Sequence, residues 1–472
     1  MIALFIIIPL VAGLISFFVK DDKSVKGFSI VASAIVFLLT LYATSCNHTL
    51  SVSLPWLPQL NSNFSLSLDG MSKMLCVLTA LSFPLVFTST IDNHYSKPNN
   101  FYGLMFLTMA GLMGVFLAND VLLFYFFWEL ALIPVYFISS QYGGERRIPV
   151  TFKFFVYTFI GSLLMLVGIM YLYFQMPNKD FSIQAFYNLH LAGNQQDLVF
   201  FLFFIAFAIK MPIFPLHTWQ PDAYEQSPTP TTMILSGVMV KMGLYATIRF
   251  VVPIFPEAVK HFSHLVIILS VIGILYASLI AIKQDDIKRL IAYSSIAHIG
   301  LMCAAIFSLQ EIGWQGVMIQ MFNHGINVIG LWIVANAIEQ QTGTRKLSEL
   351  GGLAIKAPVL ATMFMIMTLA NISLPLTNAF IGEFLMFNGL FRYNIWAAVI
   401  PLISIILVAV YSLGAMAKMF YGETTAHTEN ASEAGSFVNY TLAVIVMLVI
   451  VLGVYPHPIL QLTQDTVNAI LK

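Results

Sequence analysis

Charged residues are scarce in this chain, and their scarcity excludes an ordinary soluble protein. Only 9% of the 472 residues are charged, whereas 59% are hydrophobic. A soluble domain carries about 25% charged residues. The formal net charge is zero and no basic patch is present, so nucleic acid is not an expected partner. Apolar runs of about 18 or more residues recur along the whole length, which predicts an all-α polytopic membrane protein.

Cysteines and soluble-domain motifs are also scarce. The three cysteines, Cys46, Cys76 and Cys303, are far apart and lack metal-ligand spacing, so neither a disulfide framework nor a metal site is expected. The first stretch, "MIALFIIIPLVAGLISFFVK", has no basic region before its apolar run and no small-residue cleavage site, so it is interpreted as a first span. The loops contain no nucleotide-binding or phosphate-binding motif. Any chemistry is therefore expected inside the spans or in partner subunits.

The apolar runs predict about fourteen transmembrane helices. Their approximate ranges are 2–19, 27–45, 72–91, 101–118, 120–140, 151–175, 198–217, 230–251, 263–282, 287–308, 313–338, 358–388, 394–419 and 438–458. Most lysines and arginines outside these ranges fall in or next to the odd-numbered loops. Because cytoplasmic loops carry an excess of cationic residues, the odd loops are expected in the cytoplasm and both termini on the opposite side.

Six ionisable residues lie inside predicted spans. A charged side chain at the centre of a span costs about 2.5–3.5 kcal/mol on insertion scales, so it normally faces a partner or water inside the bundle. Each residue also has a purely structural interpretation, as a buried ion pair that holds helices together or as a histidine satisfied in the core. The six residues are Glu129, Lys210, Lys241, His298, His324 and Glu383.

Together these residues indicate a proton relay. A low dielectric favours the neutral form of a lysine, while a nearby carboxylate favours the ammonium. A Glu129–Lys210 pair would therefore link the proton affinity of Lys210 to the distance between the two groups. Histidines on consecutive spans, His298 and His324, can pass protons between neighbours at low driving force.

Two predicted spans contain helix-breaking stretches, "MPIFPLHTWQP" around residues 211–221 and "ISLPLTNAFIGE" around residues 372–383. Proline removes a backbone donor and clashes with the preceding turn. Interrupted backbone at membrane depth is tolerated where it is buried in protein or lines a watery cavity. The Lys210 charge and the first break thus both point to a hydrated site inside the membrane.

The two breaks lie five spans apart, which suggests two inverted five-helix repeats with one discontinuous helix in each. The alternative is two independent proline kinks. The expected division is an N-terminal three-helix segment (1–100), a first repeat (101–252), a second repeat (253–420) and a C-terminal helix (421–472).

Residues 120–390 resemble a known family. "WELALIPVYF", "KMPIFPLHTWQPDA", "GVMVKMGLY", "DIKRLIAYSSIAHIG" and "FNHGINVIG" are similar to the antiporter-like membrane subunits of respiratory complex I and to Mrp-type cation/proton antiporters. An acid rather than a lysine at position 383 resembles the M type of these subunits. The chain also ends soon after its last span, without the long lateral helix expected of the L type.

The resemblance implies roles for the six residues. Glu129 and Lys210 would form a modulating pair, Lys241 would be the central proton carrier, and His298 and His324 would continue the axis toward Glu383. The family usually has a motif close to "LHxWLPDAHxxAP", from which this chain departs at Gln220, Tyr224 and Ser227. Tyr224 cannot do a histidine's proton chemistry near neutral pH and receives no role. His217 keeps its match and is interpreted as a possible structural anchor.

Three functions are compatible with these observations. The first is a proton-translocating subunit of an NADH–quinone oxidoreductase, with NADH, flavin, iron–sulfur clusters and quinone held by partner subunits and no cofactor in this chain. Its expected partners are the L-type and N-type neighbours and the lipid bilayer, in a bacterial cell membrane rather than the mitochondrial inner membrane. The second is a subunit of a Na⁺/H⁺ antiporter without redox activity. The third is a membrane anchor in which the buried charges only hold helices together.

Overall fold

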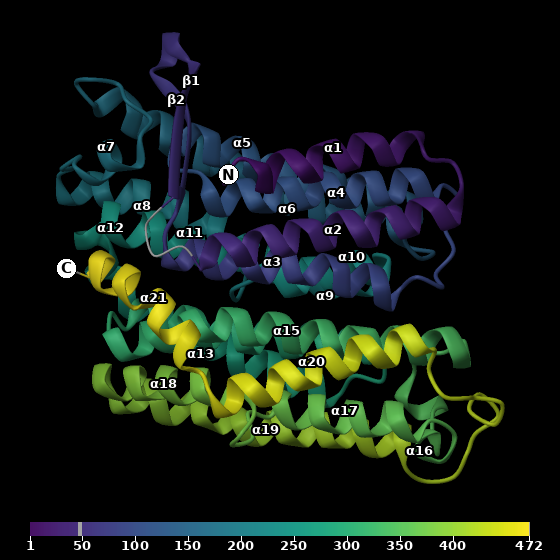
Figure 1. Ribbon diagram of the computed structural model, residues 1–472. Coiled ribbons are helices and arrows are strands. Elements are labelled where there is room, and N and C mark those ends of the chain that lie inside the picture. Colours follow the sequence, from purple (N-terminus) through teal and green to yellow (C-terminus); the bar gives the residue numbers. More distant parts are fainter. Residues whose placement is uncertain (46–49, 472) are drawn as a thin grey trace.

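The chain folds into a bundle of roughly parallel helices (Figure 1) in a computed structural model that describes residues 1–45 and 50–471. Among those residues, eleven helices are long and apolar enough to cross a membrane, and Leu4–Phe18 and Pro358–Asn371 are shorter apolar helices. The polytopic helical class is therefore confirmed, and helices lie at every predicted span. The number of crossings stays a prediction. Cys76 and Cys303 are buried and unbridged, whereas Cys46 lies outside the described residues.

The N-terminal segment contains a β-hairpin that the all-α prediction missed. Its helices are α1 (Leu4–Phe18), α2 (Asp22–Thr44) and α3 (Gly70–Ser89). Between α2 and α3, strand β1 (Leu50–Leu57), the 3-10 turn η1 (Pro58–Leu60) and strand β2 (Ser62–Leu68) form an antiparallel pair with Leu50 opposite Leu68. The alternation of apolar and serine residues in "LSVSL" and "FSLSL" is the period-2 signal that predicts such strands.

The next part of the bundle contains the first break. Its elements are α4 (Pro98–Leu117), α5 (Val121–Tyr142), α6 (Arg147–Gln175), α7 (Ile183–Tyr187), α8 (Gly193–Lys210) and α9 (Gln220–Gln226). A last helix, Thr229–Ile254, is divided into α10 (Thr229–Ile234), η2 (Leu235–Met239), α11 (Lys241–Ala246), η3 (Thr247–Val251) and α12 (Val252–Ile254). Both η2 and η3 are π-helical, whereas the sequence predicted one regular helix here.

The remaining elements contain the second break. They are α13 (Pro256–Ile282), α14 (Ile287–Phe307), α15 (Glu311–Thr342), η4 (Leu347–Glu349), α16 (Leu353–Lys356), α17 (Pro358–Asn371), α18 (Asn378–Tyr393), α19 (Ile395–Phe420), α20 (Ser436–Val454) and α21 (His457–Leu471). Helix is absent from 211–219 and from 372–377, so both predicted discontinuous helices are confirmed. Whether the two halves are inverted repeats, with the predicted boundaries, stays a prediction.

Local sequence explains where several helices begin and end. An aspartate precedes each of four helices and accepts a hydrogen bond from backbone N–H groups of the first turn, as an N-cap does. These aspartates are Asp21, Asp69, Asp120 and Asp286. Helix α15 ends at Thr342, and the next residue, Gly343, has a φ of 69° in the left-handed region that a residue without Cβ adopts readily.

Helix α15 lies at the centre of the molecule (Figure 1). It packs against α3, α10 and η2 on one side and against α14, α17, α18 and α20 on the other. Its most apolar stretch, long enough to cross a membrane, is buried throughout. Consequently, a polar residue on α15 can contact groups from both halves of the bundle without contacting lipid.

Candidate functional site

Lys241 and His324 form the centre of the candidate site. The Lys241 Nζ lies 2.9 Å from the His324 Nδ1 and donates a hydrogen bond to the Ser236 carbonyl oxygen at 2.7 Å. Lys241 is completely buried and His324 is 5% exposed. Ser236 belongs to η2, and a π-helical turn places carbonyl groups out of the regular i→i−4 pattern, often at functional sites. The irregular turn thus supplies an acceptor for the buried ammonium.

The contacts of His324 define its proton positions. An ammonium has only donors, so when Lys241 is charged the His324 Nδ1 must accept and the ring proton must be on Nε2. His324 Nε2 lies 3.3 Å from Ser295 Oγ, which can accept that proton's hydrogen bond. A proton that moves from Lys241 to Nδ1 can therefore be balanced by loss of the Nε2 proton on the other side of the ring.

His298 and Glu383 continue the path on the far side of His324. The two imidazole rings have centroids 5.5 Å apart, and His298 Nε2 lies 3.4 Å from Glu383 Oε1. His298 Nδ1 is 2.8 Å from the Ser294 carbonyl oxygen, and Nε2 is also 3.3 Å from the Asn371 carbonyl oxygen. Carbonyl oxygens only accept, so Nδ1 carries a proton, and Nε2 faces two further oxygens. This arrangement favours a pair that holds one shared proton, on the Nε2 atom or on the Glu383 carboxyl.

The second break shapes the surroundings of this pair. Asn371, the last residue of α17, turns its carbonyl toward His298, and its Nδ2 donates to Ser294 Oγ at 3.3 Å and to Ser412 Oγ at 3.0 Å. Tyr411 donates to Ser294 Oγ at 2.8 Å. A cavity of about 20 Å³ adjoins Asn371, Ser294 and Ser412, which is room for about one water molecule.

Sequence reasoning missed Asn371, Ser294, Tyr411 and Gln320. Gln320, whose Nε2 lies 3.5 Å from Glu383 Oε1, is one turn before His324 on α15, and Asn371 directly precedes the predicted break. Gln320 and Asn371 could therefore have been predicted as site residues from their positions next to His324 and the second break. Ser294 and Tyr411 were not distinguishable from the many other hydroxyl side chains of the chain.

Lys210 and Glu129 are not in direct contact. No ion pair within 4.0 Å joins them, and the buried Lys210 Nζ, which has no hydrogen-bond partner, lies 5.7 Å from the centroid of the Trp128 ring. Successive residues of a helix point about 100° apart, so Trp128, which lies against Lys210, and Glu129 leave α5 in different directions. Glu129 instead lines a lateral apolar cleft of about 380 Å³ with Trp56 of the hairpin. The predicted modulating pair could act here only through the longer-range field of the two charges.

The first break next to Lys210 carries buried polar atoms without a protein partner. They are His217 Nδ1, both side-chain polar atoms of Gln220, and the Tyr224 hydroxyl oxygen. Buried polar groups of this kind are normally satisfied by ordered water. His217 also packs its ring against Phe214 and Tyr276. The hydrated site beside Lys210 stays a prediction, which the unpartnered polar atoms in and just after the break support.

The structure thus brings four of the six predicted residues together in one row, in which the two histidines face each other with ring centroids 5.5 Å apart rather than through a hydrogen bond. Lys241, His324, His298 and Glu383 follow one another from η2/α11 through α15 and α14 to α18. No direct hydrogen bond joins Lys210 to this path. Within the described residues, no group of three or more His, Cys, Asp or Glu side chains is arranged to hold a metal ion.

Comparison with known proteins gives a family match over this region. The family model described as "NADH:quinone oxidoreductase/Mrp antiporter, TM" matches residues 118–409. That range contains all six candidate residues and both breaks. Tyr411 and Ser412, beside His298, lie just beyond it.

Individual relatives match along the full length. "NADH-quinone oxidoreductase subunit M" of Rickettsia typhi is 36% identical over 100% of this chain and 98% of its own. "F(420)H(2) dehydrogenase subunit M" of Methanosarcina mazei is 34% identical over the same shares. Among solved structures, a chain of "Respiratory complex I from Thermus thermophilus with bound NADH" is 28% identical, with a TM-score of 0.94 over 100% of this chain and 99% of that one.

Proposed function

Because the chain belongs to the NADH:quinone oxidoreductase/Mrp antiporter membrane family, we propose that it is a proton-translocating membrane subunit of an NADH–quinone oxidoreductase. The single observation that carries this proposal is the buried path from Lys241 to Glu383. A structural scaffold has no need of it, since apolar residues of similar volume often stabilise a core as well as buried charges do.

The path supports a stepwise transfer. The Lys241 ammonium gives a proton to His324 Nδ1 across 2.9 Å, and the opposite ring nitrogen releases one toward Ser295. His298 receives it and shares it with Glu383, whose protonation state sets whether the pair can accept another. Return of Lys241 to the charged form requires a proton from the side of Lys210 and the polar lining of the first break. A change of charge near either end shifts the preferred position of the proton.

Redox chemistry belongs, in this proposal, to partner subunits. NADH, flavin, iron–sulfur clusters and quinone are held there, and L-type and N-type membrane subunits are the neighbours of this chain. The names of the Rickettsia relative and of the Thermus structure support NADH as the electron donor, and a bacterial cell membrane is the proposed location. Glu129 is proposed to modulate Lys210 from a distance, and the boundaries 1–100, 101–252, 253–420 and 421–472 are proposed as the divisions of the chain.

The decisive experiment is proton translocation by the assembled Lys241→Ala complex. In inside-out vesicles, NADH-driven acidification is expected to fall at least tenfold while all subunits remain assembled. Lys346→Ala is the matched control, because Lys346 is 62% exposed and pairs only with Glu349 among the described residues. Wild-type acidification by Lys241→Ala would refute the proposal.

The same preparation separates the two other functions. A Na⁺/H⁺ antiporter subunit would purify without flavin or iron–sulfur subunits and would exchange ions without NADH. A membrane anchor would lose assembly in Lys241→Ala rather than proton transfer.

A further inference from the structure

Helix α9, the short segment that follows the first break, is held by ion pairs on two sides. Asp222 accepts from Lys153 Nζ of α6 at 2.8 Å and from Arg289 Nη1 of α14 at 3.1 Å. Glu225, one turn later, lies 2.7 Å from the same Arg289 nitrogen and 3.4 Å from Arg345 Nη2. Arg345 Nη1 also donates to the Glu225 carbonyl oxygen at 3.1 Å. Both acidic residues of α9 are therefore bound by cations from the second half of the bundle, the part of the chain from α13 onward.

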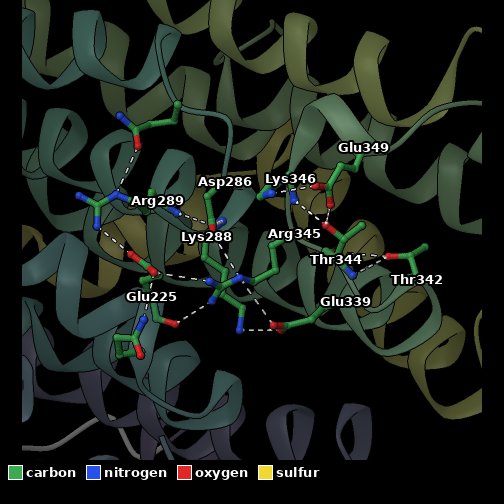
Figure 2. Close-up of polar contacts among 12 residues, drawn as sticks. Glu225, Asp286, Lys288, Arg289, Glu339, Thr342, Thr344, Arg345, Lys346 and Glu349 are labelled. Carbon is green, nitrogen blue, oxygen red and sulfur yellow. Dashed lines mark hydrogen bonds and ion pairs between the residues drawn. The ribbon is translucent and has the colours of Figure 1, made fainter. Parts of the chain in front are cut away.

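The cations that hold α9 are themselves anchored (Figure 2). Arg345 Nε lies 3.1 Å from Asp286 Oδ2 and 3.8 Å from Glu339 Oε1, and Lys288 Nζ lies 2.6 Å from Glu339 Oε2. Asp286 caps α14 through the backbone N–H groups of Lys288 and Arg289. The network thus continues from α9 into the first turn of α14 and the last turns of α15.

The charges in this network balance. The acids Asp222, Glu225, Asp286 and Glu339 match the cations Lys153, Lys288, Arg289 and Arg345, and their side chains are between 5% and 38% exposed. Removing one member of a partly buried network leaves its partners unpaired, which costs more than the net contribution of the pair. We call these eight residues the α9 network.

The α9 network lies directly after the first break in the chain, the break that follows Lys210. Residues 211–219 between Lys210 and α9 have no helix of their own to hold them. One fixed point is the hydrogen bond from Trp219 Nε1 to the Ile209 carbonyl oxygen at 3.0 Å. The second fixed point is α9 itself, which begins directly after Trp219. The path residues His298 and His324 lie on α14 and α15, the helices that carry Arg289, Lys288 and Glu339.

We propose that the α9 network is a positioning device that joins the break beside Lys210 to the helices that carry His298 and His324. Arg289 and Arg345 are its positioning residues. Arg289 lies on α14 and binds both acidic residues of α9. Arg345, which follows α15, binds Glu225 of α9 and also Asp286 and Glu339. The inference rests on the proposed function, since a position of the break matters only if a proton passes there. A shift of α14 or α15 would move α9, and with it the break that follows Lys210.

The direct test is hydrogen exchange of the α9 amides in the assembled complex. Arg289→Gln and Arg345→Gln are expected to raise the exchange rate of residues 220–226 at least tenfold, whereas the control Lys346→Gln leaves it unchanged. Arg289→Lys keeps the charge and is expected to remain within about threefold of wild type. Wild-type exchange of α9 in both glutamine variants would overturn the proposal.

Pumping provides a second readout that a merely structural role would not move. Vesicles with assembled Arg345→Gln complex are expected to translocate fewer protons per NADH oxidised, and Glu225→Gln combined with Arg345→Gln is expected to lose less than the sum of the single variants. Faster exchange of the α9 amides together with a wild-type number of protons per NADH would show that α9 is not coupled to proton transfer. Because exchange is measured without turnover, failure of Lys241→Ala to stop pumping would refute the proposed function and leave the exchange result standing.

Discussion

At the scale of single residues, the site depends on which ring nitrogen holds a proton. His324 has a different partner on each nitrogen, Lys241 on one and Ser295 on the other. His298 instead has oxygens against both. One histidine is therefore arranged to pass a proton through, and the other to retain it beside Glu383. This difference could not be derived from the sequence, because both residues are histidines in apolar helices.

The first prediction concerns His324. Replacement by alanine leaves the Lys241 ammonium with the Ser236 carbonyl alone and opens a gap between Lys241 and His298. Proton translocation by the assembled His324→Ala complex is expected to fall at least tenfold, a barrier increase of about 1.4 kcal/mol or more. Ser295→Ala removes the hydroxyl 3.3 Å from Nε2 that receives the released proton, and it is also expected to slow translocation, by less than His324→Ala because a water molecule can replace a hydroxyl group. Wild-type translocation by His324→Ala would contradict transfer through the ring.

The second prediction compares two aspartates of the α9 network. Burial raises the pKa of Asp222, but hydrogen bonds and charges of Lys153 and Arg289 outweigh it, so this pKa lies below its usual value. Its stabilisation is present above the unfolded-state pKa and is lost as the pH falls through the folded-state pKa. For Asp286, burial raises the pKa more than Arg345 and the backbone N–H groups lower it, so its ionised form is disfavoured. Its contribution weakens as the pH rises through the folded-state pKa.

At neutral pH these opposite signs give different costs. Asp222→Asn is expected to destabilise α9 by about 1.5–3 kcal/mol, the range for hydrogen bonds to charged groups. Asp286→Asn is expected to cost less than about 1 kcal/mol, because asparagine is an equally good N-cap and Arg345 keeps Glu225 and Glu339. Hydrogen-exchange protection of α9 and α14 measures both. A larger loss in Asp286→Asn would show that the two pKa shifts have been assigned the wrong sign.

At the scale of elements, proline and periodicity predicted most of the bundle. Both breaks occur where prolines remove backbone donors, and the helices lie at the predicted ranges. The π-helical turns η2 and η3 could not be predicted, because they depend on tertiary packing, of η2 against α15 and of η3 against α8, rather than on local propensity. The hairpin was missed for a different reason. Its period-2 alternation was visible, but only the helical class was considered for this chain.

Close approach of η2 and α15 is the element-scale condition for the Lys241–His324 contact. A Cβ at Gly325 would lie 2.8 Å from the Gly237 carbonyl oxygen, a backbone atom, and 2.8 Å from Leu78 Cδ1. Gly325 is the neighbour of His324, so a larger residue here moves the ring away from Lys241. Only residues without a side chain at both positions allow the two helices to approach this closely.

Gly325→Ala is therefore predicted to damage the site without removing any of its polar groups. The overpacking is expected to cost about 1–3 kcal/mol and to reduce proton translocation at least fivefold in assembled complexes. Gly414→Ala on α19, where an added Cβ meets nothing within 4 Å, is the matched control and is expected to behave as wild type. Normal pumping by Gly325→Ala would show that the close contact is not required.

At the scale of the whole molecule, the path and the α9 network both depend on the two halves being held together around α15. Helix α15 carries His324 toward Lys241 of the first half and toward His298 of the second. The α9 network joins the same halves at one end of the bundle. The two connections share α14 and α15, so a displacement of these helices reaches Lys210 and Lys241 together. Helices α14 and α15 therefore provide a physical connection between the α9 network and the path residues, of the kind that can couple two sites.

Orientation in the membrane is the remaining whole-molecule prediction. The excess of lysine and arginine in odd-numbered loops predicts that the α9 network lies at the cytoplasmic end and both termini at the other. In the structure the two termini lie toward the same end of the bundle (Figure 1).

The test of this orientation starts from a variant in which Cys46, Cys76 and Cys303 are replaced. Lys346→Cys, in an odd loop, is expected to react with a membrane-impermeant maleimide only in inside-out vesicles. His190→Cys, an exposed position in an even loop, is expected to react only in right-side-out vesicles. The reverse pattern would refute this orientation and place the α9 network on the outer face.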